Sequence, residues 1–183
     1  FDRLLGLLPN SADVLNNRAN ALMSLGRHDD AEASFNKALA MNPGHVQALL
    51  NRGKLHLARG WLAKGLSDLD AALALKPDHF EAWLDKGMVL AAMRQFGEAL
   101  ISFDRALALE PGSWRVWNER GVACVLNGQF QDGLRCYDRA VSIQPGNAIS
   151  LSNRAEALRG LGRGEEARDA YEATLQADPA FPY

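Results

Sequence analysis

The sequence has few of the residues that mark a secreted or disulfide-bonded protein. Only two of its 183 residues are cysteines, Cys124 and Cys136, and they form no CxxC motif. Two thiols do not make a disulfide framework. We therefore expect two small, buried, apolar side chains in a reducing compartment, which predicts a cytoplasmic location.

The sequence also lacks a large excess of basic or acidic residues and lacks long apolar runs. The formal net charge is -2, so the basic excess that nucleic acids or anionic membranes require is absent. No apolar run approaches the roughly 20 residues that span a bilayer. The opening residues 1–4 lack a signal-peptide pattern and look like a cut through a longer chain. We predict no binding to nucleic acid or membranes.

Residues suited to catalysis or metal binding do not cluster. No two of the histidines His28, His45, His56 and His79 have the i, i+4 spacing of a helical metal site. The glycine-rich stretch 160–164 follows no predicted strand and lacks the Lys-Ser/Thr of a phosphate loop. We therefore predict no enzymatic activity, no catalytic residue, no metal site and no cofactor.

The sequence does contain a repeat. All prolines but Pro182 lie 34 residues apart: Pro9, Pro43, Pro77, Pro111, Pro145 and Pro179. An aromatic residue or leucine recurs on the same period: Phe1, Phe35, Leu69, Phe103, Tyr137 and Tyr171. Such self-similarity indicates a repeat protein. It divides the chain 1–183, expected to be one array, into a partial repeat 1–11 and full repeats 12–45, 46–79, 80–113, 114–147 and 148–181.

Each repeat predicts two helices, which in the third repeat cover 80–93 and 97–110. Apolar residues fall close to helical spacing in both segments. Four repeats place a glycine where a left-handed backbone would end the first helix: Gly26, Gly60, Gly128 and Gly162. The third repeat has Arg94 at this place, so we expect its turn to close differently. The prolines follow the second helix, which they cannot continue.

Small residues recur at two places of the repeat, counted from its first residue. The eighth place holds Ala19, Gly53, Gly87, Gly121 and Ala155, and the twentieth holds Ala31, Gly65, Ala99, Gly133 and Ala167. Because glycine inside a helix costs on the order of 1 kcal/mol against alanine, its recurrence at one place indicates close helix packing. We expect Trp83 and Trp117 to fill the adjoining core, and Trp61 to be a candidate interface anchor.

This pattern resembles the tetratricopeptide repeat family, whose signature is W-x2-L-G-x2-Y, A-x3-F and P. The third repeat matches it with Trp83, Gly87, Leu90, Ala99, Phe103 and Pro111. The resemblance implies an all-α fold, a right-handed superhelical solenoid of antiparallel helix pairs whose first helices line a concave groove. It further implies a protein–protein interaction scaffold that binds a peptide or partner protein in that groove.

The resemblance also implies which residues line the groove: Asn16, Asn17, Asn20, Asn51, Lys54, Leu84, Asp85, Met88, Asn118, Glu119, Val122, Asn153 and Glu156. Asparagine can hold a peptide backbone through its donor and acceptor atoms. The predicted groove begins with a polar end and continues into an apolar and acidic middle. This pattern favours a ligand with apolar anchors and some basic residues. Alternatively, the asparagines bond within the scaffold. The basic clamp that binds chaperone carboxylates is not matched, since Glu81 and Asp85 would repel a carboxylate.

The chain departs from the signature at the seventh place, where the family usually has leucine. Here every repeat has a basic residue at this place: Arg18, Arg52, Lys86, Arg120 and Arg154. Two interpretations stay open. The charges reach solvent over apolar stems and pair with acids on neighbouring second helices, such as Asp70, Asp104, Asp138 and Glu172, or they form a basic stripe for an anionic ligand.

Two further functional hypotheses stay open. Arrays with an asparagine ladder precede the catalytic region of O-linked N-acetylglucosamine transferases, and segment 178–183 resembles the junction in bacterial, SPINDLY-type members. This resemblance implies the substrate-recognition arm of a larger glycosyltransferase. Alternatively, the array self-associates through open ends, because residues 1–11 lack their first helix and no polar capping helix follows residue 181.

Overall fold

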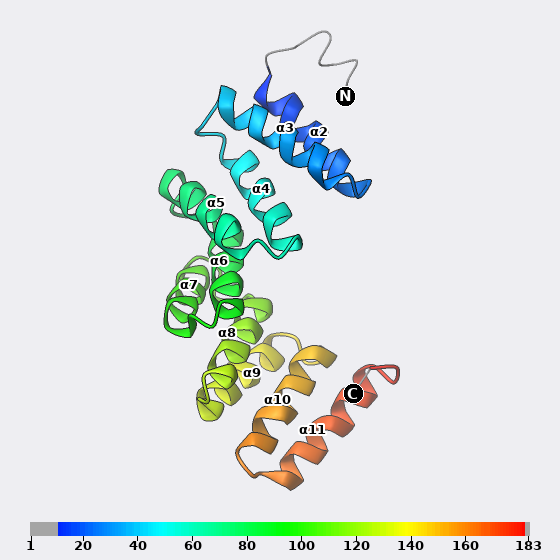
Figure 1. Ribbon diagram of the computed structural model, residues 1–183. Coiled ribbons are helices and arrows are strands. Elements are labelled where there is room, and N and C mark those ends of the chain that lie inside the picture. The colour runs from blue at the N-terminus through cyan, green and yellow to red at the C-terminus, as the bar shows by residue number, and fades with distance from the viewer. Residues whose placement is uncertain (1–10, 182–183) are drawn as a thin grey trace. The chain divides into compact units, whose positions relative to one another are not determined.

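The computed structural model describes residues 11–181, which form α-helices joined by short turns (Figure 1). The partial repeat 1–11, with Phe1 and Pro9, lies outside the described residues except for Ser11, and so does Pro182. Between residues 11 and 181 there are ten α-helices and no strand. The all-α prediction is therefore confirmed.

Each full repeat contains one helix pair. The first helices are α2 (Ala12–Ser24), α4 (Val46–Ala58), α6 (Phe80–Ala92), α8 (Trp114–Leu126) and α10 (Ala148–Gly160). The second helices are α3 (His28–Met41), α5 (Leu62–Leu75), α7 (Phe96–Leu109), α9 (Phe130–Ile143) and α11 (Gly164–Ala177). In the third repeat, the predicted helices differ from α6 and α7 by one residue at the ends.

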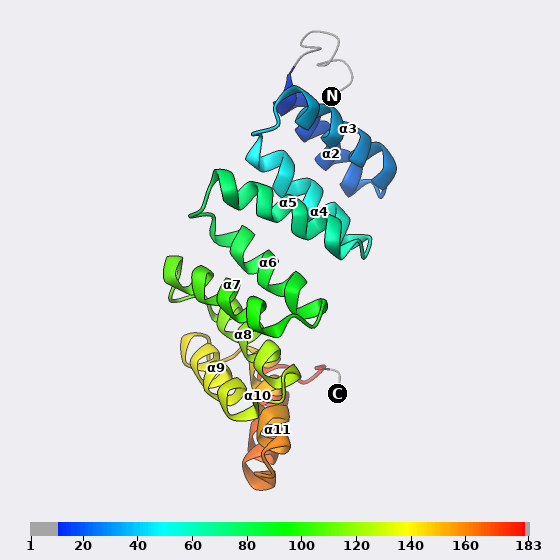
Figure 2. The same ribbon diagram turned by 60° about the vertical axis from the view of Figure 1, so that its left-hand side comes forward.

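The chain divides into two compact units, and the division falls inside α6, after Val89. In the N-terminal unit α2 packs along α3 and α4 along α5, and contacts between α3 and α4 join these pairs. In the C-terminal unit α8 packs along α9 and α10 along α11, while α9 contacts α10 and α7 contacts α8. Figures 1 and 2 show α10 and α11 side by side. That all repeats form one continuous array stays a prediction.

The largest core side chains come from the recurring aromatic or leucine place. Phe35 and Leu69 in the N-terminal unit are fully buried, and so is Phe103 in the C-terminal unit, where Tyr137 is 2% exposed. All four belong to second helices. An aromatic side chain removes about 150–250 Å² from water, so this place supplies much of the hydrophobic stabilisation of each pair.

The helices of a pair approach each other closely at the small residues. A Cβ atom on Gly121 would lie 2.5 Å from the ring of Tyr137, and one on Gly133 would lie 3.2 Å from the carbonyl oxygen of Gly121. An added Cβ atom at either glycine would require the opposing side chain, Tyr137 or Val125, to move. The prediction that these places hold the helices together is confirmed for α8 and α9.

Trp83 and Trp117 are not fully part of the core, so that prediction was wrong. Both side chains are half-buried. The indole N–H of Trp83 donates to the carbonyl oxygen of Pro77 at 2.7 Å, and that of Trp117 donates to Pro111 at 3.0 Å. An indole N–H needs such a partner. Each tryptophan thereby ties its helix to the preceding turn.

The turn between the two helices of a repeat uses a left-handed residue throughout the described chain. The four turn glycines have φ of 71°, 74°, 79° and 75°, as predicted. Arg94 has φ 60°, so the expectation of a different closure was wrong. The N–H groups of Arg94 and Gln95 donate to Ala91 and Leu90 at 2.9 and 2.8 Å. These hydrogen bonds, with the Arg94 guanidinium 5.4 Å from the Phe96 ring, hold Arg94 in a disfavoured conformation.

We predict that Gly128→Ala lowers the free energy of unfolding by about 1–2 kcal/mol, because it puts a Cβ atom on a left-handed residue. Arg94→Ala is the matched control, since Arg94 already carries a Cβ atom in that conformation, and it loses much less. Urea unfolding followed by circular dichroism measures both. Equal losses in the two variants would contradict the explanation.

Candidate protein-binding groove

The N-terminal unit contains a small groove on its first helices. It has a volume of about 260 Å³ and is lined by Gln47, Leu50, Lys54, His79, Glu81 and Asp85. These residues come from α4 and from the start of α6 with its preceding turn. The Lys54 ammonium lies 3.9 Å from the Asp85 carboxylate, and Leu50 is buried below them. The groove is therefore polar, with an acidic excess.

Asparagine side chains join the first helices of the N-terminal unit. Asn51 Nδ2 on α4 donates to Asn16 Oδ1 on α2 at 3.0 Å. Asn16 Nδ2 in turn donates to Asn17 Oδ1 at 3.3 Å, and Gln47 Nε2 donates to Asn51 Oδ1 at 3.0 Å. These amides form a chain of hydrogen bonds across two repeats, which favours the interpretation that the asparagines bond within the scaffold.

The C-terminal unit repeats this arrangement between α8 and α10. Asn118 is 3% exposed, and its Oδ1 accepts from Asn153 Nδ2 at 3.0 Å and from Ser150 Oγ at 3.2 Å. A buried amide needs such partners, because an unsatisfied polar atom away from water costs about 1–3 kcal/mol. Asn118 therefore connects two repeats and does not present its amide to a ligand.

Three predicted groove residues are buried, which removes their side chains from the surface: Asn16, Leu84 and Asn118. The sequence places them on the first helices but does not show how deep they lie. The other ten are half-buried or exposed: Asn17, Asn20, Asn51, Lys54, Asp85, Met88, Glu119, Val122, Asn153 and Glu156. Only Lys54 and Asp85 among these line the groove between α4 and α6.

Two carboxylates on first helices of the C-terminal unit differ in their electrostatics. Burial raises the pKa of Glu119, although a hydrogen bond with Asn118 and the charge of Arg115 oppose the rise. The pKa of Glu156 is lowered by a hydrogen bond from the Tyr171 hydroxyl and by hydrogen bonds from Arg159. Both groups add acidic character to the first-helix side of this unit.

The basic residues at the seventh place pair with second helices. Lys86 lies 2.7 Å from Asp70, Arg120 lies 2.8 Å from Asp104 and Arg154 lies 2.6 Å from Asp138. Each acid belongs to the preceding repeat. The predicted pairing is confirmed for these three, and Arg52 donates to Asn36 at the equivalent place at 2.8 Å. These charges therefore serve packing between repeats rather than a basic stripe.

Glu172 was expected to take part in the same pairing, but the basic residue that would face it belongs to a following repeat outside residues 1–183, so this pairing stays a prediction. Its Oε1 lies 3.8 Å from Arg168 Nε on the same helix. Sequence analysis also missed Asp68, which is buried and accepts from Arg52 at 2.6 and 3.0 Å. The signal was present, because Asp68 occupies a place where the other repeats have Ser, Cys or Ala.

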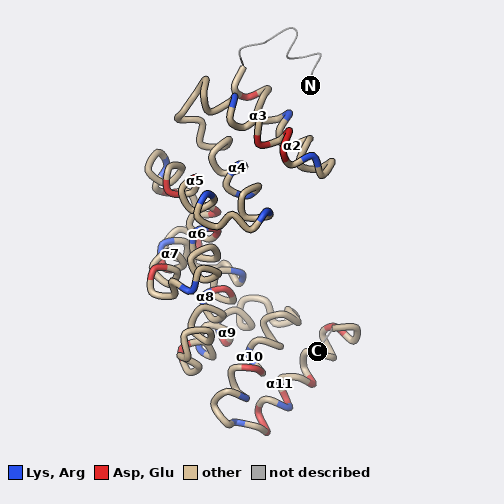
Figure 3. The backbone as a smooth tube through the Cα atoms, viewed as in Figure 1, with Lys and Arg blue, Asp and Glu red and all other residues tan. Residues whose placement is uncertain are grey.

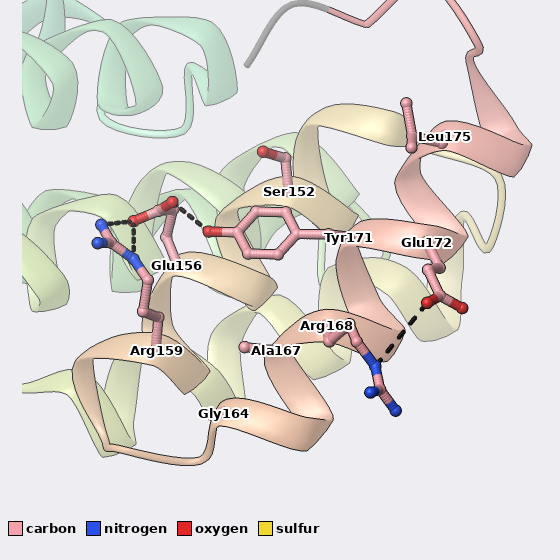
Figure 4. Close-up of a pocket in the computed structure, with 9 residues that line it drawn as sticks. All are labelled: Ser152, Glu156, Arg159, Gly164, Ala167, Arg168, Tyr171, Glu172 and Leu175. Atoms are coloured by element: carbon pink, nitrogen blue, oxygen red, sulfur yellow. Dashed lines mark hydrogen bonds and ion pairs between the residues drawn. The ribbon is translucent and has the colours of Figure 1, made fainter.

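A larger apolar pocket lies on α10 and α11 and was not predicted. It has a volume of about 620 Å³ and is lined by Ser152, Glu156, Arg159, Gly164, Ala167, Arg168, Tyr171, Glu172 and Leu175 (Figure 4). Tyr171 lies across it, with its hydroxyl donating to Glu156. Unlike its counterparts in other repeats, Tyr171 is only half-buried, and Leu175 is 39% exposed.

A further polar pocket of about 290 Å³ lies on the N-terminal unit and is lined by residues that include Glu32, Arg52, His56 and Asp68. Acidic and basic residues are interspersed along the helices (Figure 3). Across residues 11–181 no three His, Cys, Asp or Glu side chains gather as a metal site would require. No helix within that range has the length and apolar character needed to cross a membrane.

Trp61, the candidate interface anchor, has two cations over its ring, with Arg59 at 3.9 Å and Lys64 at 4.2 Å from the ring centre.

Comparison with protein families identifies the repeat. The family model described as Tetratricopeptide repeat matches residues 16–80, 50–104, 84–148 and 125–182. The chain belongs to the tetratricopeptide repeat family. The family resemblance seen in the sequence is confirmed. A search of curated proteins by sequence finds no match.

Solved structures show the same fold. MamA matches with 21% identity over 92% of each chain and a TM-score of 0.84. MamA from Desulfovibrio magneticus RS-1 matches with 19% identity over 94% of this chain and 97% of its own, at a TM-score of 0.87. YrrB, described as a TPR protein with an unusual peptide-binding site, matches with 19% identity over 98% and 93%, at 0.81. The fold class predicted from the sequence is therefore confirmed.

We predict that Asn118→Ala lowers the free energy of unfolding by about 1–3 kcal/mol, since it leaves the Ser150 hydroxyl and the Asn153 amide without their acceptor. Asn127→Ala is the matched control, because Asn127 is an exposed asparagine at the end of the same helix. Thermal and urea unfolding compare the two variants. A loss of the same size in Asn127→Ala would contradict a specific role of Asn118.

Proposed function

We propose that the chain is a protein-interaction scaffold that binds a segment of a partner protein on its first helices. The observation that carries this proposal is the groove between α4 and α6, which combines an apolar floor at Leu50 with charged walls. Most sites that bind peptides combine such anchoring and orienting groups. The tetratricopeptide family membership and the likeness of fold to YrrB support the same function.

The charges of the groove favour a ligand with apolar anchors and basic residues. Glu81 and Asp85 supply two carboxylates, and Lys54 supplies one ammonium that lies near Asp85. Glu119 and Glu156 add acidic groups in the C-terminal unit. The asparagines that bond to one another can still bind the backbone of a peptide ligand, because Asn51 retains a second amide hydrogen after donating to Asn16. Acidic peptides would meet repulsion at these carboxylates.

A peptide library tests this proposal, with enrichment of sequences that combine Lys or Arg with large apolar residues as the expected result. The variant Glu81→Gln with Asp85→Asn should bind the selected peptides about ten-fold more weakly, because it removes both negative charges while keeping side-chain size. Glu98→Gln, an exposed acid on second helix α7, is the control and keeps full affinity. Calorimetric titration measures the affinities. Selection of acidic peptides alone would overturn the ligand class.

Self-association is a second candidate, and the pocket on α10 and α11 favours it. In the preceding repeat, Tyr137 at the place of Tyr171 is 2% exposed and packs in one cluster with Ala155 of α10. Tyr171 and Leu175 offer a similar apolar face that is more exposed than Tyr137. We propose that a first helix of a second copy packs on this face.

Light scattering across concentration tests this second candidate. We expect the wild-type chain to gain mass with concentration and Leu175→Asp to stay monomeric, because a charge on the apolar face opposes its burial. Ile101→Asp is the matched control, since Ile101 is 62% exposed on α7, away from this face. A wild-type chain that stays monomeric at every concentration would contradict the proposal of self-association. The glycosyltransferase arm stays a prediction, which sequence beyond residue 183 would test.

A further inference from the structure

The two cysteines face each other inside one helix pair. Cys124 on α8 and Cys136 on α9 are each 2% exposed, and the two thiols lie close enough for each to shift the pKa of the other. Arg120, one turn before Cys124, points its guanidinium at the same sulfur, with Nη1 3.1 Å from Cys136 Sγ. The same guanidinium binds Asp104 on α7 through Nε at 2.8 Å. A buried sulfur therefore lies between a thiol and a cation.

The repeat provides an independent view of what this place accepts. Two repeats earlier, the residues at the same three places are Arg52, His56 and Asp68. Arg52 binds the Asp68 carboxylate through two hydrogen bonds at 2.6 and 3.0 Å. His56 Nδ1 lies 3.0 Å from Asp68 Oδ2, a contact that does not qualify as a hydrogen bond. Cys136 thus occupies the position of a buried anion, and Cys124 that of its neighbouring polar group.

The electrostatics of the pair agree with this comparison. The pKa of Cys136 is lowered by the hydrogen bond from Cys124 and then by Arg120, and these effects outweigh burial and the charge of Asp132. The pKa of Cys124 is raised by the same hydrogen bond and by burial. One sulfur is therefore favoured as the thiolate and the other as the thiol. A thiolate is the nucleophilic form of cysteine.

We propose that Cys136 and Cys124 form a redox site, in which Cys136 reacts with a hydroperoxide and Cys124 then closes a disulfide between α8 and α9. Arg120 is the positioning residue that keeps Cys136 ionised. The two cysteines belong to the C-terminal unit, and the residues lining the groove between α4 and α6 belong to the N-terminal unit. The proposal therefore does not depend on the peptide-binding function.

The chemistry is balanced with hydrogen peroxide as the oxidant. The Cys136 thiolate attacks one peroxide oxygen, the O–O bond breaks, and the leaving hydroxide takes up a proton to give water and a sulfenic acid. The Cys124 sulfur then attacks the Cys136 sulfur, the S–O bond breaks, and the hydroxide leaves with the Cys124 proton as a second water. Both sulfurs are oxidised and the peroxide is reduced.

Oxidation changes the charge inside the helix pair. The disulfide is neutral, so Arg120 loses the anion at Cys136 and keeps Asp104 as its partner. Because Asp104 belongs to the preceding repeat, the site couples the redox state of one repeat to the contact between α7 and α8. The inferred function is a peroxide-sensitive link within the C-terminal unit.

Treatment of the intact chain with hydrogen peroxide tests the proposal. Mass spectrometry of the native protein should show loss of two hydrogen atoms and a peptide that joins Cys124 to Cys136. In Cys124→Ser the reaction should stop at a Cys136 sulfenic acid, which dimedone traps. In Cys136→Ser, Cys124 should stay reduced. Two thiols that survive in the folded chain and react only after addition of urea would overturn the proposal.

A pH series separates the positioning role of Arg120 from a structural one. Arg120→Met should lower the rate of Cys136 alkylation near pH 7 about ten-fold, because the thiolate loses its cation, and should move the rate profile to higher pH. Arg120→Lys should restore most of the rate. Asp104→Asn removes the other partner of Arg120 and serves as a control for packing. An unchanged rate profile in a folded Arg120→Met chain would refute the assignment.

Discussion

The close approach of the two helices in each pair is the constraint on which the rest of the structure depends. At Gly121 and Gly133 the backbones of α8 and α9 come so near that an added Cβ atom would overlap the opposing helix. This contact sets the register of the pair. This register brings together Arg120, which directly precedes Gly121, Cys124 one turn further along α8, and Cys136 one turn after Gly133 on α9, with Arg120 Nη1 3.1 Å from Cys136 Sγ.

A polar layer follows from this register and runs through the packing. Arg52 with Asp68, and Arg120 with Cys136, are buried or half-buried, and each guanidinium also reaches the preceding second helix, at Asn36 and Asp104. Removing charges from water is costly unless their hydrogen bonds are satisfied. Each cation here has partners on two helices. The layer therefore connects consecutive repeats while the aromatic place supplies the hydrophobic core of each pair.

The period of the sequence was enough to predict the helices, because identical places have identical environments. Helix ends followed from glycine and proline, and the buried place followed from Phe35 and its equivalents. The left-handed conformation of Arg94 was not predicted, because the backbone hydrogen bonds of the turn outweigh the preference of a non-glycine residue for a right-handed backbone. Trp83 was misplaced because periodicity gives the face of a helix, while the demand of the indole N–H for a partner decides how deep the ring sits.

The candidate sites were harder to predict for a related reason. The predicted groove residues lie on first helices, and their role in binding stays a prediction. Asn118 is buried because Asn153 from the next repeat covers it, which no single repeat reveals. The contact between the cysteines requires the register of two helices, and spacing along the chain does not supply it. Only comparison of Cys136 with Asp68, two repeats away, shows that this place accepts an anion beside an arginine.

Variation between repeats is where function can lie in such a chain. Places that hold small or aromatic residues in every repeat are used for packing and cannot distinguish one ligand from another. The places of Lys54 and Asp85 change from repeat to repeat, and they line the groove between α4 and α6. The place of Cys136 also changes and holds Ser34, Asp68, Ser102, Cys136 and Ala170 in turn, while the seventh place stays basic in every repeat. The cation stays while its partner varies. The second repeat therefore holds the permanent negative charge of Asp68, and the fourth holds, in the proposed redox site, a Cys136 thiolate whose charge oxidation removes.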